Sequence, residues 1–222
     1  MKNSLKCQSL FTFKSDFFKS IFSEFEYPWD ILSHIEEIID RIIRRGIEGY
    51  SLVDTSILLG PGVSVDDCVS ISGPAIIGSG SKLRHGAYIR GGVIIGNECV
   101  IGNSSEVKNS ILMDRAQAPH FNYIGDSILG EGAHLGAGAI CSNLRSDGKS
   151  VQIKSDGICI DTGRRKLGAI LGDNVEIGCG AVLCPGTVIG KNSSVYPLTL
   201  AKNTYPCNSI VKNDCTVSKK NT

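Results

Sequence analysis

Aliphatic residues recur at every sixth position over a long stretch in the first half of the chain. All eleven positions of this series hold an aliphatic residue or methionine: Val53, Leu59, Val65, Ile71, Ile77, Leu83, Ile89, Ile95, Ile101, Val107 and Met113. An α-helix would need apolar residues three and four positions apart, and a single strand would alternate with a period of two. A period of six, with glycine directly after several of the aliphatic residues, is typical of a β-helix in which three hexapeptides form one coil.

The same spacing returns after two interruptions, at Leu129, Leu135, Cys141, Leu171, Ile177, Leu183, Ile189, Val195 and Ala201. We therefore predict an all-β protein, with a parallel β-helix over residues 51–203, loop insertions at residues 114–123 and 143–168, and a C-terminal tail over residues 204–222. The alternative is a sandwich of short strands, but sandwich strands vary in length and would not keep one period over so many residues.

The residues before the repeat predict an N-terminal arm over residues 1–50. Residues 1–26 show no clear period, whereas a helix is expected from Tyr27, with Pro28 suited to its start and Gly46 to its end. This helix carries one apolar stripe, formed by Ile31, Ile35, Ile38, Ile39, Ile42 and Ile43. The stripe is expected to pack against the flank of the prism or against a neighbouring subunit.

Charge and composition exclude several classes of function. The chain has 23 Lys and Arg against 22 Asp and Glu, so nothing favours nucleic acid or an anionic membrane as the main partner. No apolar run approaches the roughly 18 residues that a membrane span needs. Charged residues interrupt the N-terminal segment, so we expect no signal peptide and a cytoplasmic location. The nine cysteines form no CxxC pair, which predicts reduced thiols and no metal site, with Cys99 and Cys141 as small apolar residues of the repeat.

Because a prism has no cleft of its own, we expect function at the two interruptions. The first contains His120. Stacked coils place residues about eighteen apart over one another, so His120 is expected near Glu106, Lys108 and Tyr123. A general base with a carboxylate to orient it and a cation for a phosphate is a plausible catalytic set. The second interruption is rich in cations that together suit an anionic ligand such as a sugar phosphate or the phosphates of coenzyme A: Arg145, Lys149, Lys154, Arg164, Arg165 and Lys166.

Several short runs make the chain resemble a known family. They are EVK at 106–108, PHFNYIGDS at 119–127, LGAG at 135–138 and SNLR at 142–145. These runs resemble the acetyltransferase domain of the bifunctional glucosamine-1-phosphate acetyltransferase/N-acetylglucosamine-1-phosphate uridylyltransferases. TGRRKLGA at 162–169 looks like the archaeal-type sugar-1-phosphate nucleotidyltransferases, and YPWDIL at 27–32 is similar to the segment that joins their two domains.

The resemblance implies a left-handed coil, a homotrimer with its site between adjacent prisms, and transfer of acetyl from acetyl-CoA to the 2-amino group of an amino-sugar 1-phosphate. Glucosamine 1-phosphate is the first expectation, as a step of UDP-N-acetylglucosamine biosynthesis. His120 would be the general base, Glu106 would orient it, Asn143 would position the amine, and the Ala137 N–H would face the oxyanion. The residues matching those that bind the sugar phosphate are Arg90, Lys108, Tyr123 and the loop residue Lys149. His134 stands where the bacterial enzymes have asparagine, and this difference affects the acceptor contacts.

Other readings remain open. The chain contains no GxGT nucleotide loop, and fifty residues cannot form an α/β nucleotide-binding domain, so we predict no uridylyltransferase activity and consider a separate nucleotidyltransferase as a partner. One alternative is an acyltransferase for another sugar nucleotide or acyl donor. A γ-type carbonic anhydrase would need three histidine ligands, but His85, His120 and His134 lack the close pair of that family. The last is a non-catalytic prism that binds a sugar phosphate or a partner protein.

Overall fold

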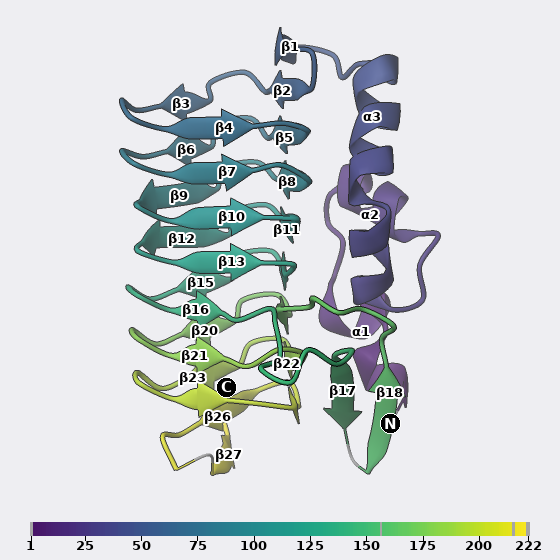
Figure 1. Ribbon diagram of the computed structural model, residues 1–222, viewed down its shortest axis with the longest axis vertical. Helices are drawn as coiled ribbons and strands as arrows, with labels where there is room; N and C mark the ends of the chain where they lie inside the picture. The colour runs from purple at the N-terminus through teal and green to yellow at the C-terminus, as the bar shows by residue number, and fades with distance from the viewer. Residues whose placement is uncertain (1, 156, 215, 221–222) are drawn as a thin grey trace.

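Three parallel β-sheets form the faces of a prism in the computed structural model, which describes residues 2–155, 157–214 and 216–220 (Figure 1). We call them sheets A, B and C, in the order in which each coil visits them. In Figure 1 the strands of sheet C run from left to right across the front, the chain returns behind them, and successive coils descend. This rotation is left-handed. The predicted left-handed parallel β-helix with a helical arm is therefore confirmed.

Each sheet is a stack of short strands. Sheet A contains β1 (Ser51–Asp54), β2 (Ile57–Leu59), β5 (Ala75–Ile77), β8 (Val93–Ile95), β11 (Ser110–Leu112), β14 (Ile128–Leu129), β19 (Ala169–Leu171), β22 (Thr187–Ile189) and β25 (Thr204–Tyr205). Sheet B contains β3 (Ser64–Val65), β6 (Lys82–Leu83), β9 (Val100–Asn103), β12 (Gln117–His120), β15 (His134–Leu135), β20 (Glu176–Ile177), β23 (Ser194–Val195), β26 (Ser209–Val211) and β27 (Val217–Lys219). Sheet C contains β4 (Ser70–Ser72), β7 (Tyr88–Arg90), β10 (Glu106–Lys108), β13 (Tyr123–Gly125), β16 (Ile140–Cys141), β21 (Val182–Leu183) and β24 (Leu200–Ala201).

The core is a column of inward side chains along the prism axis. Most hexapeptides contribute one large aliphatic residue and one smaller residue two positions earlier, as Ala75 and Ile77 do, and Cys99 and Cys141 are fully buried there. Glycine follows the aliphatic residue where coils approach closely: a Cβ at Gly102 would overlap the carbonyl of Pro119. The small and large inward side chains together fill the narrow interior of the prism, which has room for a single column of side chains.

The six-residue period is shortened at three places where sheet C turns into sheet A: between Val107 and Leu112, between Ile124 and Leu129, and between Ala201 and Tyr205. Leu112 pairs with Ile95 and is fully buried, so it takes the inward position that the spacing had assigned to Met113. Met113 instead packs in the apolar layer beneath the helices. The first member of the series, Val53, was also placed wrongly, because β1 runs antiparallel to β2 and leaves this side chain 56% exposed.

Residues 114–123 differ from the expected loop insertion. Strand β12 pairs with β9 and β15, and β13 pairs with β10 and β16, so this segment continues the regular coils. The physical reason is the shortened period, which displaces the aliphatic positions by one residue and makes a regular coil look interrupted. His120 therefore ends a strand of the wall instead of lying in a loop.

Residues 143–168 leave the coil. They contain the antiparallel hairpin of β17 (Gln152–Ser155) and β18 (Ile158–Asp161), which lies beside the N-terminal arm in Figure 1. The chain then resumes at β19, which pairs directly with β14. At the other end, β25 and β26 fall within the expected tail and continue the stack, and β27 closes it by antiparallel pairing with β26.

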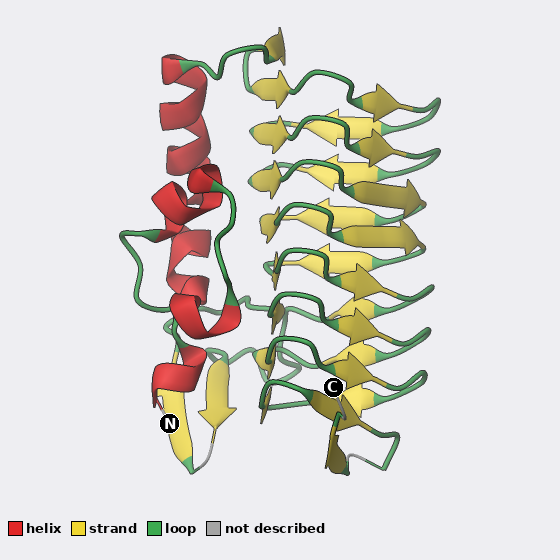
Figure 2. Cartoon of the chain, turned by 180° about the vertical axis from the view of Figure 1, so that it is seen from behind, coloured by secondary structure: helices red, strands yellow, loops and turns green. Residues whose placement is uncertain are grey.

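The arm covers the outer face of sheet A (Figure 2). Its helices are η1 (Lys2–Leu5), α1 (Cys7–Leu10), α2 (Asp16–Phe22), η2 (Pro28–Ser33) and α3 (Ile35–Arg45). The helix expected from Tyr27 thus begins as a 3-10 turn, and Gly46 ends α3 with a φ of 74°. The isoleucine stripe packs on the prism of its own chain, because Ile35 and Ile39 share one buried cluster with Ile94 and Ile128 of sheet A.

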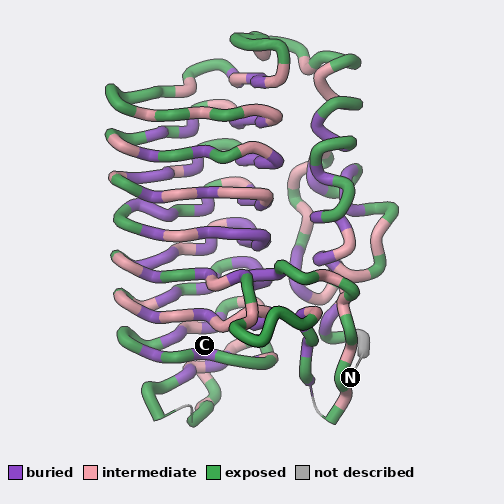
Figure 3. Tube along the Cα trace, viewed as in Figure 1, coloured by how far each residue is buried: buried purple, intermediate pink, exposed green. Residues whose placement is uncertain are grey.

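Burial divides the prism into a covered face and two open faces (Figure 3). Strands β5, β8 and β11 of sheet A are buried at every position, whereas strands of sheet C such as β7 alternate between exposed and buried residues. Polar side chains for binding are therefore displayed on the open faces. None of the described helices is long and apolar enough to cross a membrane.

Candidate functional site

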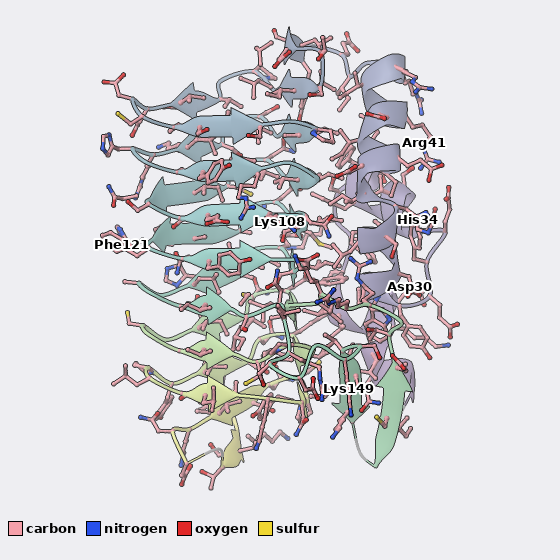
Figure 4. All side chains as sticks on the ribbon, in the orientation of Figure 1. Asp30, His34, Arg41, Lys108, Phe121 and Lys149 are labelled. Carbon is pink, nitrogen blue, oxygen red and sulfur yellow. The ribbon has the colours of Figure 1, made fainter. Side chains whose placement is uncertain are left out.

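Four of the predicted site residues meet on the outer face of sheet C. Glu106 lies in register between Tyr88 and Tyr123, because β10 pairs in parallel with both β7 and β13. Arg90 and Lys108 occupy the next outward position of their strands, and Lys108 is labelled on the front face in Figure 4. Stacking thus brings residues of three coils into one patch, formed by Arg90, Glu106, Lys108 and Tyr123.

Glu106 forms an ion pair with Arg90. The Arg90 Nη1 atom donates to Glu106 Oε1 over 2.6 Å, and about a third of each side chain or more is exposed. This hydrogen bond is also the main cause that raises the pKa of Arg90. The carboxylate that was expected to orient His120 is therefore engaged with a cation of its own sheet.

His120 lies at the corner where sheet B turns into sheet C, and its side chain is exposed. Its backbone is fixed from both sides: the His120 N–H donates to Asn122 Oδ1 over 3.1 Å, and its carbonyl accepts from the Gly138 N–H over 3.0 Å. The next residue, Phe121, has a φ of 54° and is 62% exposed, and it projects from the corner in Figure 4. No hydrogen bond joins His120 to Glu106 among the described residues.

Asn122 is a structural residue of this corner that the sequence analysis missed. It is 2% exposed, and its Nδ2 donates to the carbonyls of Gly136 (2.8 Å) and Ala139 (3.3 Å) in the next coil. Its own N–H donates to Ser105 Oγ (3.1 Å) in the preceding coil. Asn122 therefore ties together three coils around His120. Asn122 belongs to the recognised run HFNYIGDS. The residue types in that run do not show whether its amide side chain is buried or exposed.

Ala137 and His134 follow one coil later, in different places. Ala137 is exposed on the turn that begins at Gly136, and the neighbouring Gly138 bonds the His120 carbonyl, so this turn lies directly under the histidine corner. His134 starts β15 in sheet B, and its Nδ1 lies 2.9 Å from Glu176 Oε2. The structure thus brings Ala137 to the corner and leaves His134 on the adjacent face.

Asn143 joins the patch through a buried carboxylate, Asp126. The Asn143 Nδ2 donates to Asp126 Oδ2 over 2.6 Å and to the Tyr123 hydroxyl over 3.2 Å. Asp126 is 3% exposed, and Lys108 Nζ and Arg164 Nη2 each lie 3.8 Å from its carboxylate. Burial raises the pKa of Tyr123. Burial also lowers the pKa of Arg164, although the nearby Asp126 carboxylate acts in the opposite direction. Sequence reasoning included Asp126 in the recognised run but gave it no role.

The cations of the 143–168 segment separate into different positions. Arg164 is the cation of this segment that lies near the patch, at 3.8 Å from Asp126. Its Nη1 donates to Ser33 of the arm, and its Nε donates to the Lys166 carbonyl over 3.2 Å. Lys149 is exposed and lies beside the hairpin in Figure 4, far from the corner that carries Phe121. Arg145 is paired with Asp147 and holds the pKa of that carboxyl below its usual range.

The histidines do not gather. His120 is paired with Asn103 of the preceding coil, and His85 lies one coil further away. Two coil steps therefore separate His120 from His85. In the part of the chain that the structure describes, no three His, Cys, Asp or Glu side chains lie together in a way that could hold a metal ion.

Comparison with known proteins places these residues in a family context. The family model described as the GMPPB C-terminal domain matches residues 71–164. A bifunctional sugar-1-phosphate nucleotidylyltransferase/acetyltransferase from Sulfurisphaera tokodaii is 42% identical over 91 residues, which cover 41% of this chain and 23% of that protein. The bifunctional protein GlmU of Methanococcus maripaludis is 38% identical over 214 residues, covering 87% of this chain and 48% of that protein.

Among solved structures, the UDP-N-acetylglucosamine acyltransferase of Francisella novicida is 12% identical, with a TM-score of 0.47 and coverage of 76% of this chain and 67% of that chain. This chain spans less than half the length of either curated relative above. The matched segment 71–164 includes His120, Asn143 and the whole sheet C patch. The chain is a relative of the bifunctional sugar-1-phosphate nucleotidylyltransferase/acetyltransferases and corresponds to their C-terminal part.

Proposed function

We propose that the chain is an acetyltransferase that moves acetyl from acetyl-CoA to the 2-amino group of an amino-sugar 1-phosphate, with glucosamine 1-phosphate as the first candidate. The observation that carries the proposal is the patch on sheet C, where Arg90, Lys108, Tyr123 and Asn143 lie together, with the exposed His120 at the corner that leads into β13. Two cations suit a phosphate, and an amide suits an amine. The relatives' printed names support the same chemistry.

In this reaction the neutral amine of the sugar attacks the carbonyl carbon of the thioester. His120 takes the amine proton as the C–N bond forms, and the Ala137 N–H donates to the oxyanion. The C–S bond then breaks, and the coenzyme A sulfur leaves with the proton that His120 had taken. The products are an N-acetyl amide and a free thiol, so atoms and protons balance.

We assign Glu106 a different role from the one expected. Because its carboxylate bonds Arg90 over 2.6 Å, Glu106 would hold the guanidinium in place for the sugar phosphate instead of orienting His120. Loss of Glu106 would then weaken acceptor binding more than it changes the proton transfer.

A homotrimer belongs to the same proposal. Several exposed apolar side chains follow the lower part of sheet C and its corner: Ile140, Leu144, Tyr196, Leu198 and Leu200. A second copy packed on this surface would cover it and would form a site between prisms. Lys149, which lies away from the corner of its own chain, would then serve a neighbouring site.

Thiol release from acetyl-CoA tests the reaction, with glucosamine 1-phosphate, galactosamine 1-phosphate and glucosamine 6-phosphate as acceptors. We expect turnover with a 1-phosphate that is indifferent to chelator. His120→Ala should reduce kcat by about 10²- to 10⁴-fold, which is the usual contribution of a general base. A folded protein without turnover on any acceptor would overturn the proposal, and full activity of His120→Ala would remove the assigned base.

A further inference from the structure

The carboxylate of Asp126 is buried behind the sheet C patch, and each of its two oxygens accepts a hydrogen bond. Its Oδ1 accepts from Asn109 Nδ2 over 2.8 Å and its Oδ2 accepts from Asn143 Nδ2 over 2.6 Å. Lys108 and Arg164 supply positive charge at 3.8 Å. A buried charge is stable only when it is paired and hydrogen-bonded, and both conditions are met here. Asp126 is therefore fixed and does not face the site as a base or a ligand.

The backbone holds Asp126 equally firmly. Its N–H donates to the Lys108 carbonyl over 2.9 Å, and its carbonyl accepts from the Gly168 N–H over 2.8 Å, where the 143–168 segment returns to the coil. Arg164, from the same segment, is anchored on Ser33 of the arm. Asp126 is thus the point at which the wall, the returning segment and the arm meet.

The partners of the Asn143 amide determine how it is turned. Its Nδ2 donates to Asp126 Oδ2 and to the Tyr123 hydroxyl, which accounts for both of its hydrogens. A carboxylate only accepts, so the opposite amide orientation would place two acceptors against each other. The remaining atom, Asn143 Oδ1, has no hydrogen-bond partner among the described residues and is not among the buried polar atoms that lack one. This acceptor oxygen is therefore available to a further donor.

We propose that Asp126 is a positioning residue that fixes the Asn143 amide so that its Oδ1 accepts a hydrogen bond from the substrate amine. This inference rests on the proposed function. An attacking amine needs its lone pair directed at the thioester carbon. An oxygen that accepts one N–H leaves the lone pair free, whereas an amide NH₂ in the same place would donate to the lone pair and block it. The orientation of one amide thus decides whether the bound amine can react.

Asp126→Asn tests the inference, because it keeps the shape of the side chain but offers an NH₂ that can donate to Asn143 Oδ1 and so permits the reversed orientation. We expect kcat/KM for the amino-sugar acceptor to fall by about 10- to 100-fold, as for loss of a hydrogen bond to a buried polar group. The KM for acetyl-CoA should stay close to that of the unaltered protein, while the thermal midpoint falls, because Lys108 and Arg164 lose the charge that they face. A merely structural role would instead affect both substrates alike.

Asn109→Gly is the matched control. Asn109 also donates an amide hydrogen bond to Asp126 but does not contact Asn143, and its φ of 45° suits glycine. We expect this variant to keep the acceptor kcat/KM within a few-fold. An equal loss in Asn109→Gly and Asp126→Asn would overturn the positioning role, and so would an unchanged acceptor kcat/KM in Asp126→Asn.

Hydrogen exchange of the Asn143 side-chain amide separates this inference from the proposed function. The NMR signal can be assigned by its absence in Asn143→Asp. We expect slow exchange in the unaltered protein and faster exchange in Asp126→Asn. If the unaltered chain shows no turnover, the proposed function fails, while slow exchange still supports a fixed amide. Equally fast exchange in both proteins overturns the inference whatever the activity.

Discussion

Two short polar side chains, Asn122 and Asp126, organise the wall of the prism around the candidate site. Asn122 connects three coils at the histidine corner, and Asp126 holds the Asn143 amide, which we propose contacts the substrate. Both are almost fully buried. Polar groups in such positions contribute to stability only while every hydrogen bond is made, so they fix local geometry more strictly than an apolar residue would.

Asn122→Ala should lower the free energy of unfolding by about 2–3 kcal/mol, because it leaves several buried partners without a hydrogen bond. Urea denaturation would measure the loss. Asn103→Ala is the matched control one coil earlier, since among the described residues the Asn103 side chain has a single hydrogen bond, accepted from Ser104 Oγ near the surface (3.1 Å). Equal changes in the two variants would contradict the assigned role of Asn122.

Residue-scale prediction from the sequence reached His120 and the sheet C patch but not these two polar residues. Stacking of residues about eighteen apart predicted that Glu106, Lys108 and Tyr123 lie near one another, and the strand pairing brings them onto one face. Whether Asn122 and Asp126 point into the wall depends on the backbone at each corner. Asp126 has a φ of 49°, and this left-handed turn cannot be read from residue type alone.

At the scale of elements, the arm and sheet A stabilise each other through one apolar layer. Helix α3 and the segments before it place their apolar side chains on the outer face of β5, β8 and β11, and both sides are buried. Each fully buried aliphatic side chain contributes about 1.5–3 kcal/mol. The arm is therefore part of the folded unit.

Ile39→Ala should destabilise the protein by about 2–5 kcal/mol, as usual for truncation of a fully buried isoleucine. Ile39 is 0% exposed, whereas Ile42, one turn later on the same helix, is only partly buried. Ile42→Ala should accordingly cost clearly less. Thermal denaturation of both variants compares them directly, and the reverse order would mean that α3 packs differently on sheet A.

The hexapeptide period predicted most strands but failed in three coils where sheet C turns into sheet A, first at Asn109. Asn109, with a φ of 45°, fills the space that Gly91 and Gly92 occupy one coil earlier, so this coil is one residue shorter. A fixed count of six cannot register such a change, and it therefore assigned Met113 to the core and read residues 114–123 as an interruption. The isoleucine stripe of the helix was correctly found, because helical periodicity does not depend on those turns.

At the scale of the whole molecule, the narrow core of the prism contains two cysteines, Cys99 in a small inward position and Cys141 in a position that usually holds a large aliphatic residue. Cys99 and Cys141 are fully buried, and desolvation raises the pKa of each thiol from 9.0 to about 12. In the unfolded chain both thiols would titrate near their ordinary value. The interior thus binds these two protons more tightly than the unfolded state does.

This difference predicts a loss of stability in alkali. Because the folded pKa is raised, the stabilisation is complete below pH 9 and is lost as pH rises from 9 toward 12, by at most about 1.4 kcal/mol per pH unit for each thiol. Urea unfolding under reducing conditions at pH 8 to 10.5 would measure the slope. Replacing both cysteines by alanine creates small cavities at every pH, yet it should reduce the slope, while the buried Cys7 thiol, whose pKa is also raised to about 12, still contributes. An unchanged slope would mean that the buried thiols do not control the alkaline stability of the prism.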